Sequence, residues 1–293
     1  MTILITGANG QVGRELATRA DASVLALDRS ALDITDRELV LATLQRIRPG
    51  VVINAAAYTA VDKAEQEPGK AFSINRDGAA CLASACSTLG VPLLHLSTDY
   101  VFDGLKMSPY LETDLTSPQG VYARSKWQGE QQIRNGLRQH LILRVSWVFG
   151  AHGNNFVKTI LRLARERPQL RVIADQHGCP TYAGDIADAL LSLARQIQNG
   201  QDLVWGTYHY TGTPATTWHG FASEIVSRAY ASGLIATAPP VQPISTAEYP
   251  LPAPRPANSL LDCSGAENQL GLHRRDWRRG LDHVLQSLAE NPA

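Results

Sequence analysis

The chain has 293 residues, of which 44% are hydrophobic and 18% charged, and its 27 basic and 27 acidic residues balance to no net charge. These values are typical of a globular protein with a sizeable core, and they argue against disorder. The sequence has no cluster of basic residues typical of nucleic-acid binding and no apolar run near the roughly 18 residues of a membrane span, so we expect it to bind neither nucleic acid nor membrane. It also shows no signal-peptide pattern, and its four cysteines lack metal-ligand spacing. We therefore expect a cytoplasmic protein with reduced cysteines.

The first half of the chain alternates short apolar runs with helical patterns. Continuous apolar strands separated by helices are typical of a parallel sheet that is covered on both faces. The expected strands are 3–6, 24–28, 51–55, 93–97 and 141–145, and the expected helices between them are 11–20, 36–48, 62–89 and 121–138. We therefore predict an α/β fold in which residues 1–150 form a Rossmann-like, doubly wound parallel sheet that binds a dinucleotide.

After residue 150 the alternation is less regular. The expected elements are helices at 154–167, 184–197, 217–230, 264–270 and 276–289, and one strand at 170–174. The segment 239–256 is rich in prolines, which remove backbone donors and fix φ, so we expect no regular element there. We predict that residues 151–293 form a smaller, mainly substrate-binding α/β part, some of whose segments return to the Rossmann core.

A glycine-rich turn follows the first expected strand, in the stretch "ITGANGQVG". Gly7, Gly10 and Gly13 would let the chain turn tightly, let its backbone approach a pyrophosphate and let the next helix lie close to the sheet. The N-terminus of that helix would attract the negative charge. A plain turn between strand and helix could also carry three glycines. The strand before them, the helix after them and Asp28 at the end of the second strand, suited to the adenosine ribose, together indicate a dinucleotide site.

The preference between the two nicotinamide cofactors stays open. Asp28 favours NADH, whereas the adjacent Arg29 could hold the 2′-phosphate of NADPH. We take NADPH as the expected cofactor and NADH as the alternative. The other residues expected to line the cofactor are Gln11, Val12, Asp33, Ile34, Ala55, Ala56, Ala57, Tyr58, Thr59 and Leu96. For the three alanines, close packing against the sheet is an equally good explanation.

Three residues form a candidate catalytic group. Thr98 ends the fourth expected strand at the carboxyl edge of the sheet, where open α/β folds bind ligands. Tyr122 and Lys126 lie one helical turn apart, so they share a helix face. A half-buried tyrosine beside a surface lysine would give the same spacing. The three residues and the glycine spacing resemble the Ser/Thr-Tyr-Lys site and the cofactor turn of the extended short-chain dehydrogenase/reductases.

Motifs along nearly the whole chain resemble one family of that superfamily. They include "GANGQVGREL", "STDYVFDG", "YARSKWQGE" and "RPANSLLD", and they run in order from residue 7 to residue 262. These stretches are similar to dTDP-4-dehydrorhamnose reductases, which reduce the C4 ketone of dTDP-4-dehydro-β-L-rhamnose to give dTDP-β-L-rhamnose. The resemblance implies an NAD(P)H-dependent oxidoreductase of dTDP-rhamnose biosynthesis, with a nucleotide sugar as its substrate.

The resemblance also implies roles for single residues. Tyr122 matches the proton donor, Lys126 would lower the Tyr122 pKa and hold the nicotinamide ribose, and Thr98 would orient the substrate carbonyl. The positions that match substrate contacts are Thr98, Asp99, Trp147 and Arg255, the last at the diphosphate. Core packing for Trp147 and an ordinary surface loop for Arg255 remain alternative explanations.

Some members of the family are described as dimers bridged by Mg²⁺ through carboxylates. Glu15 matches one such position, but Gly184 stands where we would align another, with Asp185 next to it. A hard cation needs several oxygen ligands, so a bridging Mg²⁺ is doubtful in this chain. We assign no metal ligand, and both a monomer and a homodimer are compatible with the sequence.

Two alternative functions remain open. A nucleotide-sugar epimerase or dehydratase shares the fold and the Tyr-Lys pair, although dehydratases carry an acidic residue where this chain has Tyr100 after Thr98-Asp99. A non-catalytic, cofactor-binding regulatory subunit, similar to the β-subunit of methionine adenosyltransferase, would bind the cofactor without turnover. The sequence does not indicate which glycan receives the rhamnose.

Overall fold

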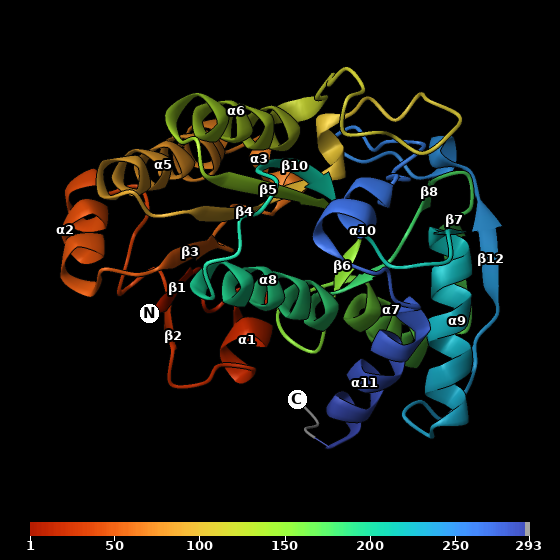
Figure 1. Ribbon diagram of the computed structural model, residues 1–293. Coiled ribbons are helices and arrows are strands. Elements are labelled where there is room, and N and C mark those ends of the chain that lie inside the picture. Colours follow the sequence, from red (N-terminus) through yellow and green to blue (C-terminus); the bar gives the residue numbers. More distant parts are fainter. Residues whose placement is uncertain (291–293) are drawn as a thin grey trace.

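A six-stranded parallel sheet forms the centre of the computed structural model, which describes residues 1–290 (Figure 1). Its strand order is β10-β5-β4-β3-β1-β2, and every neighbouring pair is parallel. The strands are β1 (Ile3–Thr6), β2 (Val24–Leu27), β3 (Val51–Asn54), β4 (Leu93–Thr98), β5 (His140–Val145) and β10 (Gly206–His209). The chain runs from β1 to β2 at one edge and then returns to β3 on the other side of β1. This order confirms the predicted doubly wound, Rossmann-like α/β fold.

Helices cover both faces of the sheet (Figure 1). One face carries α1 (Gln11–Thr18) and α8 (Ala183–Gln198), and the other carries α2 (Arg37–Ile47), α5 (Gly78–Leu89) and α6 (Gly120–Gly136). Successive strand residues point to opposite faces, so Ile3 and Ile5 pack towards α1 and α8 while Leu4 packs towards α2 and α5. All three side chains are fully buried, and each burial stabilises the fold by about 1.5–3 kcal/mol. Two-sided burial explains why β1 and β3, at the centre of the sheet, are nearly continuous apolar runs.

The central lobe contains one strand that was not predicted and one helix that was predicted wrongly. Strand β10 was not predicted, because "GTYH" is short and mixed in character, yet it pairs with β5 at the sheet edge. The predicted helix 62–89 is instead divided into α3 (Val61–Ala64), α4 (Pro68–Phe72), a π-helical turn (Ser73–Asp77) and α5. Pro68 lies in the first turn of α4, where its missing N–H is tolerated, but it cannot continue a helix from the preceding residues.

A smaller lobe lies beyond the carboxyl ends of the strands, on the right of Figure 1. Its longer elements are α7 (Phe156–Glu166), β7 (Leu170–Ile173), α9 (Trp218–Ala231), β12 (Val241–Ile244) and α11 (Trp277–Glu290). Its short elements are β6 (Val148–Phe149), β8 (His177–Gly178), β9 (Thr181–Tyr182) and β11 (Thr216–Thr217), while α10 (Ser264–Leu270) packs against the central lobe. The smaller lobe has a separate hydrophobic core, which includes Phe149, Leu161, Phe221 and Trp277. Within residues 1–290, no helix combines the length and apolar character needed to cross a membrane.

Strand β12 contradicts the expectation that the proline-rich segment 239–256 holds no regular element. It pairs in parallel with β7 alone, with Pro243 opposite Val172. A proline is tolerated in such an edge strand because its missing N–H can face away from the partner. Two elements that come after residue 150, α8 and β10, pack in the central lobe. The division of the chain at residue 150 stays a prediction. Residues 291–293 lie outside the part of the chain that the structure describes.

Candidate active site

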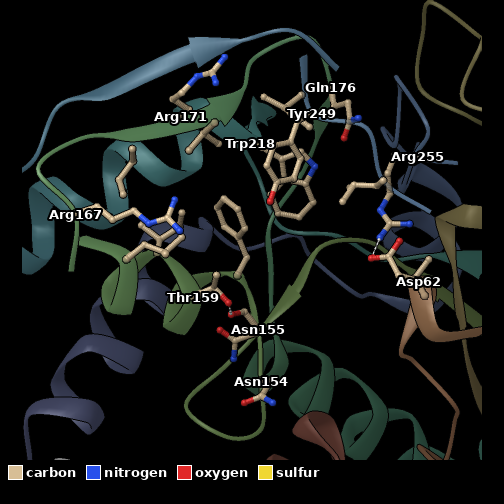
Figure 2. A pocket seen from close by; sticks show the side chains of 18 of the residues that line it. Asp62, Asn154, Asn155, Thr159, Arg167, Arg171, Gln176, Trp218, Tyr249 and Arg255 are labelled. Atoms are coloured by element: carbon tan, nitrogen blue, oxygen red, sulfur yellow. Dashed lines mark hydrogen bonds and ion pairs between the residues drawn. The ribbon is translucent and has the colours of Figure 1, made fainter. Parts of the chain in front are cut away.

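A cavity of about 800 Å³ lies between the end of β3, the smaller lobe and the proline-rich segment (Figure 2). Thr59 and Asp62 line it from the central lobe, and α7, β7 and the start of α9 line it from the smaller lobe. Ligands of doubly wound sheets bind at the carboxyl ends of the strands. This cavity is therefore the candidate substrate site.

In the glycine turn between β1 and α1, Gly7 and Gly13 are closely packed against neighbouring backbone, whereas Gly10 has open space beside it. Gly7 has φ +76°, and a Cβ on it would lie 2.5 Å from the Ala56 nitrogen. A Cβ on Gly13 would lie 2.0 Å from the Gly7 oxygen, so both positions need glycine. Gly10 is the N-cap of α1, and a Cβ there would meet only the Gly7 oxygen at 3.3 Å and the Ala55 oxygen at 3.9 Å. The turn thus offers free backbone at a helix N-terminus, and its residues fit the pyrophosphate of a dinucleotide.

The predicted ribose and adenine residues follow β2. The Asp28 carboxylate accepts hydrogen bonds from Ser30 and from the Asn9 amide (2.8 Å), and such bonds hold its pKa below the ordinary value. The Arg29 side chain is 68% exposed and its Nε lies 3.1 Å from an Asp33 oxygen. The Ile34 side chain is buried in the core. Asp28 and Arg29 are thus the groups on the surface that a nucleotide could reach.

The other predicted cofactor residues lie around the ends of β3 and β4. Ala55 packs in the core and Ala56 contacts the glycine turn, whereas Ala57 is half-buried. The buried Tyr58 donates its hydroxyl to Glu67 (3.0 Å), and Thr59 lines the cavity.

Three further predicted positions link the glycine turn to its neighbours. Val12 is buried in the core beside α8. Gln11 accepts a hydrogen bond from the Asn155 amide (3.1 Å), which joins the turn to the start of α7. The Leu96 carbonyl accepts a hydrogen bond from Lys126 (2.7 Å).

Thr98, Tyr122 and Lys126 are all buried at this edge of the sheet. Burial raises the pKa of Tyr122 to about 12, while the Thr98 hydroxyl acts in the opposite direction. Burial also lowers the pKa of Lys126 to about 8, against the attraction of Glu130. The expectation that Lys126 lowers the Tyr122 pKa was therefore wrong, because burial outweighs any such effect. A phenol that stays protonated at neutral pH suits a proton donor.

Asp99 is buried beside the Thr98 hydroxyl, which donates to its Oδ1 (3.0 Å). Its Oδ2 has no hydrogen-bond partner among residues 1–290. Burial raises the pKa of Asp99 to about 6, and the neighbouring Ser259 and Thr98 act against this rise. Buried polar atoms are nearly always paired, so this oxygen is an acceptor that the protein leaves unsatisfied.

Trp147 adopts a strained backbone conformation, with φ +49°. Its ring stacks on Trp218 with centroids 3.6 Å apart, and a Cβ on Gly178 would lie 2.4 Å from the Trp147 ring. Trp218 lines the cavity, whereas Trp147 is not among the residues described as lining it (Figure 2). Strained residues held by their surroundings cluster at functional sites. Trp147 thus supports a wall of the cavity.

Arg255 points into the cavity from the proline-rich segment and is paired with Asp62 (Figure 2). The two side chains are 2.7 Å apart, and the Arg255 side chain is only 17% exposed. The sequence predicted Arg255 but missed other polar and aromatic lining residues, among them Asn155, Arg167, Arg171, Gln176, Trp218 and Tyr249. They come from separate elements that meet only in the fold. Asn155 and Trp218 had a signal in the sequence, because they lie in two further stretches that resemble the family, "NNFVKTILRLA" (154–164) and "TWHGFA" (217–222). Arg167, Arg171, Gln176 and Tyr249 lie outside these stretches.

The structure gives no support for a bridging Mg²⁺. Glu15 forms an ion pair with Arg19, which also pairs with Asp188, while Asp185 pairs with Arg275. Within the described residues, no group of three or more His, Cys, Asp or Glu side chains could hold a metal ion. The carboxylates considered for Mg²⁺ are therefore occupied by arginines.

Comparisons with known proteins agree over the full described length. The family model described as the RmlD substrate binding domain matches residues 1–290. The dTDP-4-dehydrorhamnose reductase of Aggregatibacter actinomycetemcomitans is 46% identical over 286 residues, which cover 96% of this chain and 97% of the relative. The crystal structure of a dTDP-4-dehydrorhamnose reductase from Clostridium acetobutylicum matches with a TM-score of 0.90 and 37% identity, covering 99% of this chain and 100% of the other. That of the Bacillus anthracis enzyme in complex with NADP matches with a TM-score of 0.89 and 36% identity, covering 98% and 99%. The chain therefore belongs to the dTDP-4-dehydrorhamnose reductase family.

Proposed function

We propose that this protein reduces the C4 ketone of dTDP-4-dehydro-β-L-rhamnose to the alcohol of dTDP-β-L-rhamnose, with NADPH as the preferred hydride donor. One observation carries the proposal: a buried, protonated tyrosine and a buried lysine lie at the same sheet edge as an open glycine turn. The names of the relatives, and the 46% identity to the Aggregatibacter actinomycetemcomitans enzyme, support the identity of the substrate.

The bound nicotinamide supplies the hydride, and the protein supplies the proton. As the C4 carbon accepts the hydride, its oxygen becomes an alkoxide and needs a proton. The Tyr122 phenol gives its proton to that oxygen, which becomes the product hydroxyl, and Tyr122 is left as a phenolate. The Thr98 hydroxyl hydrogen-bonds the same oxygen, and Lys126 holds the nicotinamide ribose. General acid catalysis of this kind typically contributes a factor of roughly 10²–10⁴ in rate.

The nucleotide sugar binds in the cavity with its diphosphate at Arg255. Arg167 and Arg171 add positive charge to the cavity from the side of α7 and β7, across from Arg255 (Figure 2). Trp218 and Tyr249 offer aromatic faces to the neutral parts of the substrate. The unsatisfied Asp99 oxygen accepts a hydrogen bond from a sugar hydroxyl. A diphosphate anchor far from the reacting ketone provides binding energy that positions C4 for the reaction.

NADPH is preferred because the exposed Arg29 guanidinium can reach a 2′-phosphate beside Asp28. The related Bacillus anthracis enzyme was solved in complex with NADP, which supports this choice. NADH remains usable, since Asp28 accepts hydrogen bonds in the position expected for a ribose contact.

Steady-state oxidation of NADPH and NADH with the dTDP-ketosugar tests the proposal. We expect turnover with both cofactors and a higher kcat/KM with NADPH. An epimerase would return the cofactor unchanged, a dehydratase would release water from the sugar, and a regulatory subunit would show no turnover. Any of these three results would contradict the proposed reaction, and a higher kcat/KM with NADH would contradict the cofactor assignment.

A further inference from the structure

Three buried polar side chains form a row across the sheet beneath α6. Thr6, Asn54 and His95 are partners in the register of β1, β3 and β4, so they point to the same face. Each is at most 1% exposed. Such a row in a buried part of the sheet needs a physical reason, because buried polar groups stabilise a fold only when they are paired.

The hydrogen bonds fix how Asn54 lies. Its Oδ1 accepts from the Ala56 backbone N–H (3.0 Å) and from the Thr6 hydroxyl (2.7 Å). A backbone N–H can only donate, so the amide oxygen must face Ala56 and the amide nitrogen must face His95. That nitrogen lies 2.9 Å from His95 Nδ1. Since an amide NH₂ can only donate, Nδ1 carries no proton, and the neutral His95 ring carries its proton on Nε2.

The protonated Nε2 faces the catalytic lysine. It lies 3.5 Å from Lys126 Nζ, which also donates to the Leu96 carbonyl (2.7 Å). An imidazole N–H can only donate, so this contact is favourable when the lysine is an amine with a lone pair and unfavourable when it is an ammonium. Burial lowers the pKa of His95 well below its ordinary value, which keeps the ring neutral.

The other charged and titratable groups near α6 either favour the ammonium form of Lys126 or do not contact its Nζ. Glu130 on the same helix favours the ammonium, but both of its oxygens are engaged by Arg144, Arg134 and Ser97. The other elements packed against α6 also carry charged or titratable groups: Asp62 and Lys63 on α3, Lys70 on α4, the half-exposed Arg76–Asp77 pair on the π-helical turn, Cys81 and Cys86 on α5, Asp99 and Tyr100 directly after β4, and His140 on β5, with Glu65 at the N-terminus of α6 and Tyr122 on the helix itself. Within residues 1–290, no hydrogen bond or ion pair joins any of them to Lys126 Nζ. His95 is therefore the titratable side chain of the sheet that contacts Nζ.

We propose that Asn54 and His95 are positioning residues that hold an N–H against Lys126 and so make its ammonium group release a proton more readily. The inference rests on the proposed function, in which Lys126 holds the cofactor ribose beside the proton donor. Burial raises the pKa of Tyr122 to about 12 and lowers the pKa of Lys126 to about 8, so we expect the loss of activity at basic pH to follow the deprotonation of Lys126.

The tautomer of His95 tests the proposal without any turnover. We would record long-range ¹H–¹⁵N spectra of the full chain with labelled histidine, and assign His95 as the signal that is missing in His95→Gln. We expect a neutral ring with its proton on Nε2 between about pH 6 and pH 8. A ring protonated on Nδ1, or an imidazolium in that range, would overturn the inference.

The pH profile of kcat tests the effect on Lys126. His95→Leu removes the N–H, so the basic limb should shift upwards by about one pH unit, the usual weight of one hydrogen bond. His95→Gln keeps an N–H near the same place and should restore a profile close to that of the parent. The matched control is His209→Gln, since His209 is a buried neutral histidine on β10 whose contacts are with Arg144 and the backbone of Tyr110 and Asp262. The basic limb of the kcat profile of His209→Gln should stay at the pH of the parent protein.

A second variant covers the case in which His95→Leu does not fold. Asn54→Asp keeps one oxygen for Ala56 and offers the other to His95, so the ring proton moves to Nδ1 and Nε2 becomes an acceptor for the ammonium. The basic limb should again shift upwards. An unshifted limb in a folded His95→Leu or Asn54→Asp protein would overturn the inference. If the tautomer is as expected but no ketosugar is reduced, the proposed function fails instead, so the two failures are distinguishable.

Discussion

Replacing Arg255 by alanine should weaken binding of the nucleotide sugar while leaving the cofactor site intact. The Arg255 side chain is 17% exposed and lines the cavity, so its charge is little screened by solvent. A charged hydrogen bond contributes about 1.5–3 kcal/mol, and each 1.4 kcal/mol corresponds to about a factor of ten in affinity. We therefore expect Arg255→Ala to raise the KM of the dTDP-sugar, and the Kd of dTDP measured by calorimetry, by roughly 10–100-fold.

Two matched variants separate diphosphate binding from a structural role of the ion pair. Asp62→Asn removes the carboxylate that now holds the guanidinium, while its amide oxygen can still accept from the Ala253 N–H. If Arg255 binds the diphosphate, Asp62→Asn should leave KM unchanged or lower it. Arg162→Ala, in an exposed ion pair on α7 outside the cavity, should change neither KM nor Kd. Equal losses of thermal stability in Arg255→Ala and Asp62→Asn, with an unchanged Kd for dTDP, would refute the diphosphate assignment.

Three other variants test the proton donor, the glycine turn and the buried ion pair. Tyr122→Phe should lower kcat by roughly 10²–10⁴-fold while NADPH still binds; near-normal turnover would exclude Tyr122 as the acid. Gly10→Val should abolish NADPH binding in fluorescence titrations with little change in Tm, because the new side chain projects over the open side of the turn. Unchanged NADPH binding would show that the glycine turn does not hold the pyrophosphate. Glu130→Gln should reduce the free energy of unfolding in urea by about 3–5 kcal/mol, because it leaves the fully buried Arg144 without its carboxylate. The exposed Glu166→Gln should change it by about 0.5 kcal/mol or less, and equal losses in the two variants would contradict this reasoning.

The sequence was most informative where one local cause fixes the structure. Strands buried on both faces are continuous apolar runs, so β1, β3 and β5 could be found without tertiary information. Elements decided by their neighbours could not: β10 is a strand because β5 offers it an edge, and β12 carries a proline that only an edge position tolerates. Pro68 is a local signal in the sequence for the break between α3 and α4, because proline cannot continue a helix from the residues before it.

The candidate site shows the same division. The glycine turn and the Tyr122–Lys126 spacing are local patterns, and the family resemblance supplied their roles. The pKa of Tyr122 could not be read from the spacing, because burial decides its direction and burial depends on the whole fold. Trp218 and Tyr249 reach the cavity from distant segments, and the contact of His95 with Lys126 depends on how β4 lies beneath α6.

The most direct test of the central claim follows the hydride itself. NADPH carrying deuterium at the transferable position of the nicotinamide would be incubated with the protein and dTDP-4-dehydro-β-L-rhamnose, and the sugar product would be analysed by NMR and mass spectrometry. The account predicts dTDP-β-L-rhamnose with one deuterium at C4, formed in equal amount to the NADP⁺ released. A product without deuterium at C4, or cofactor that is returned unchanged, would contradict it.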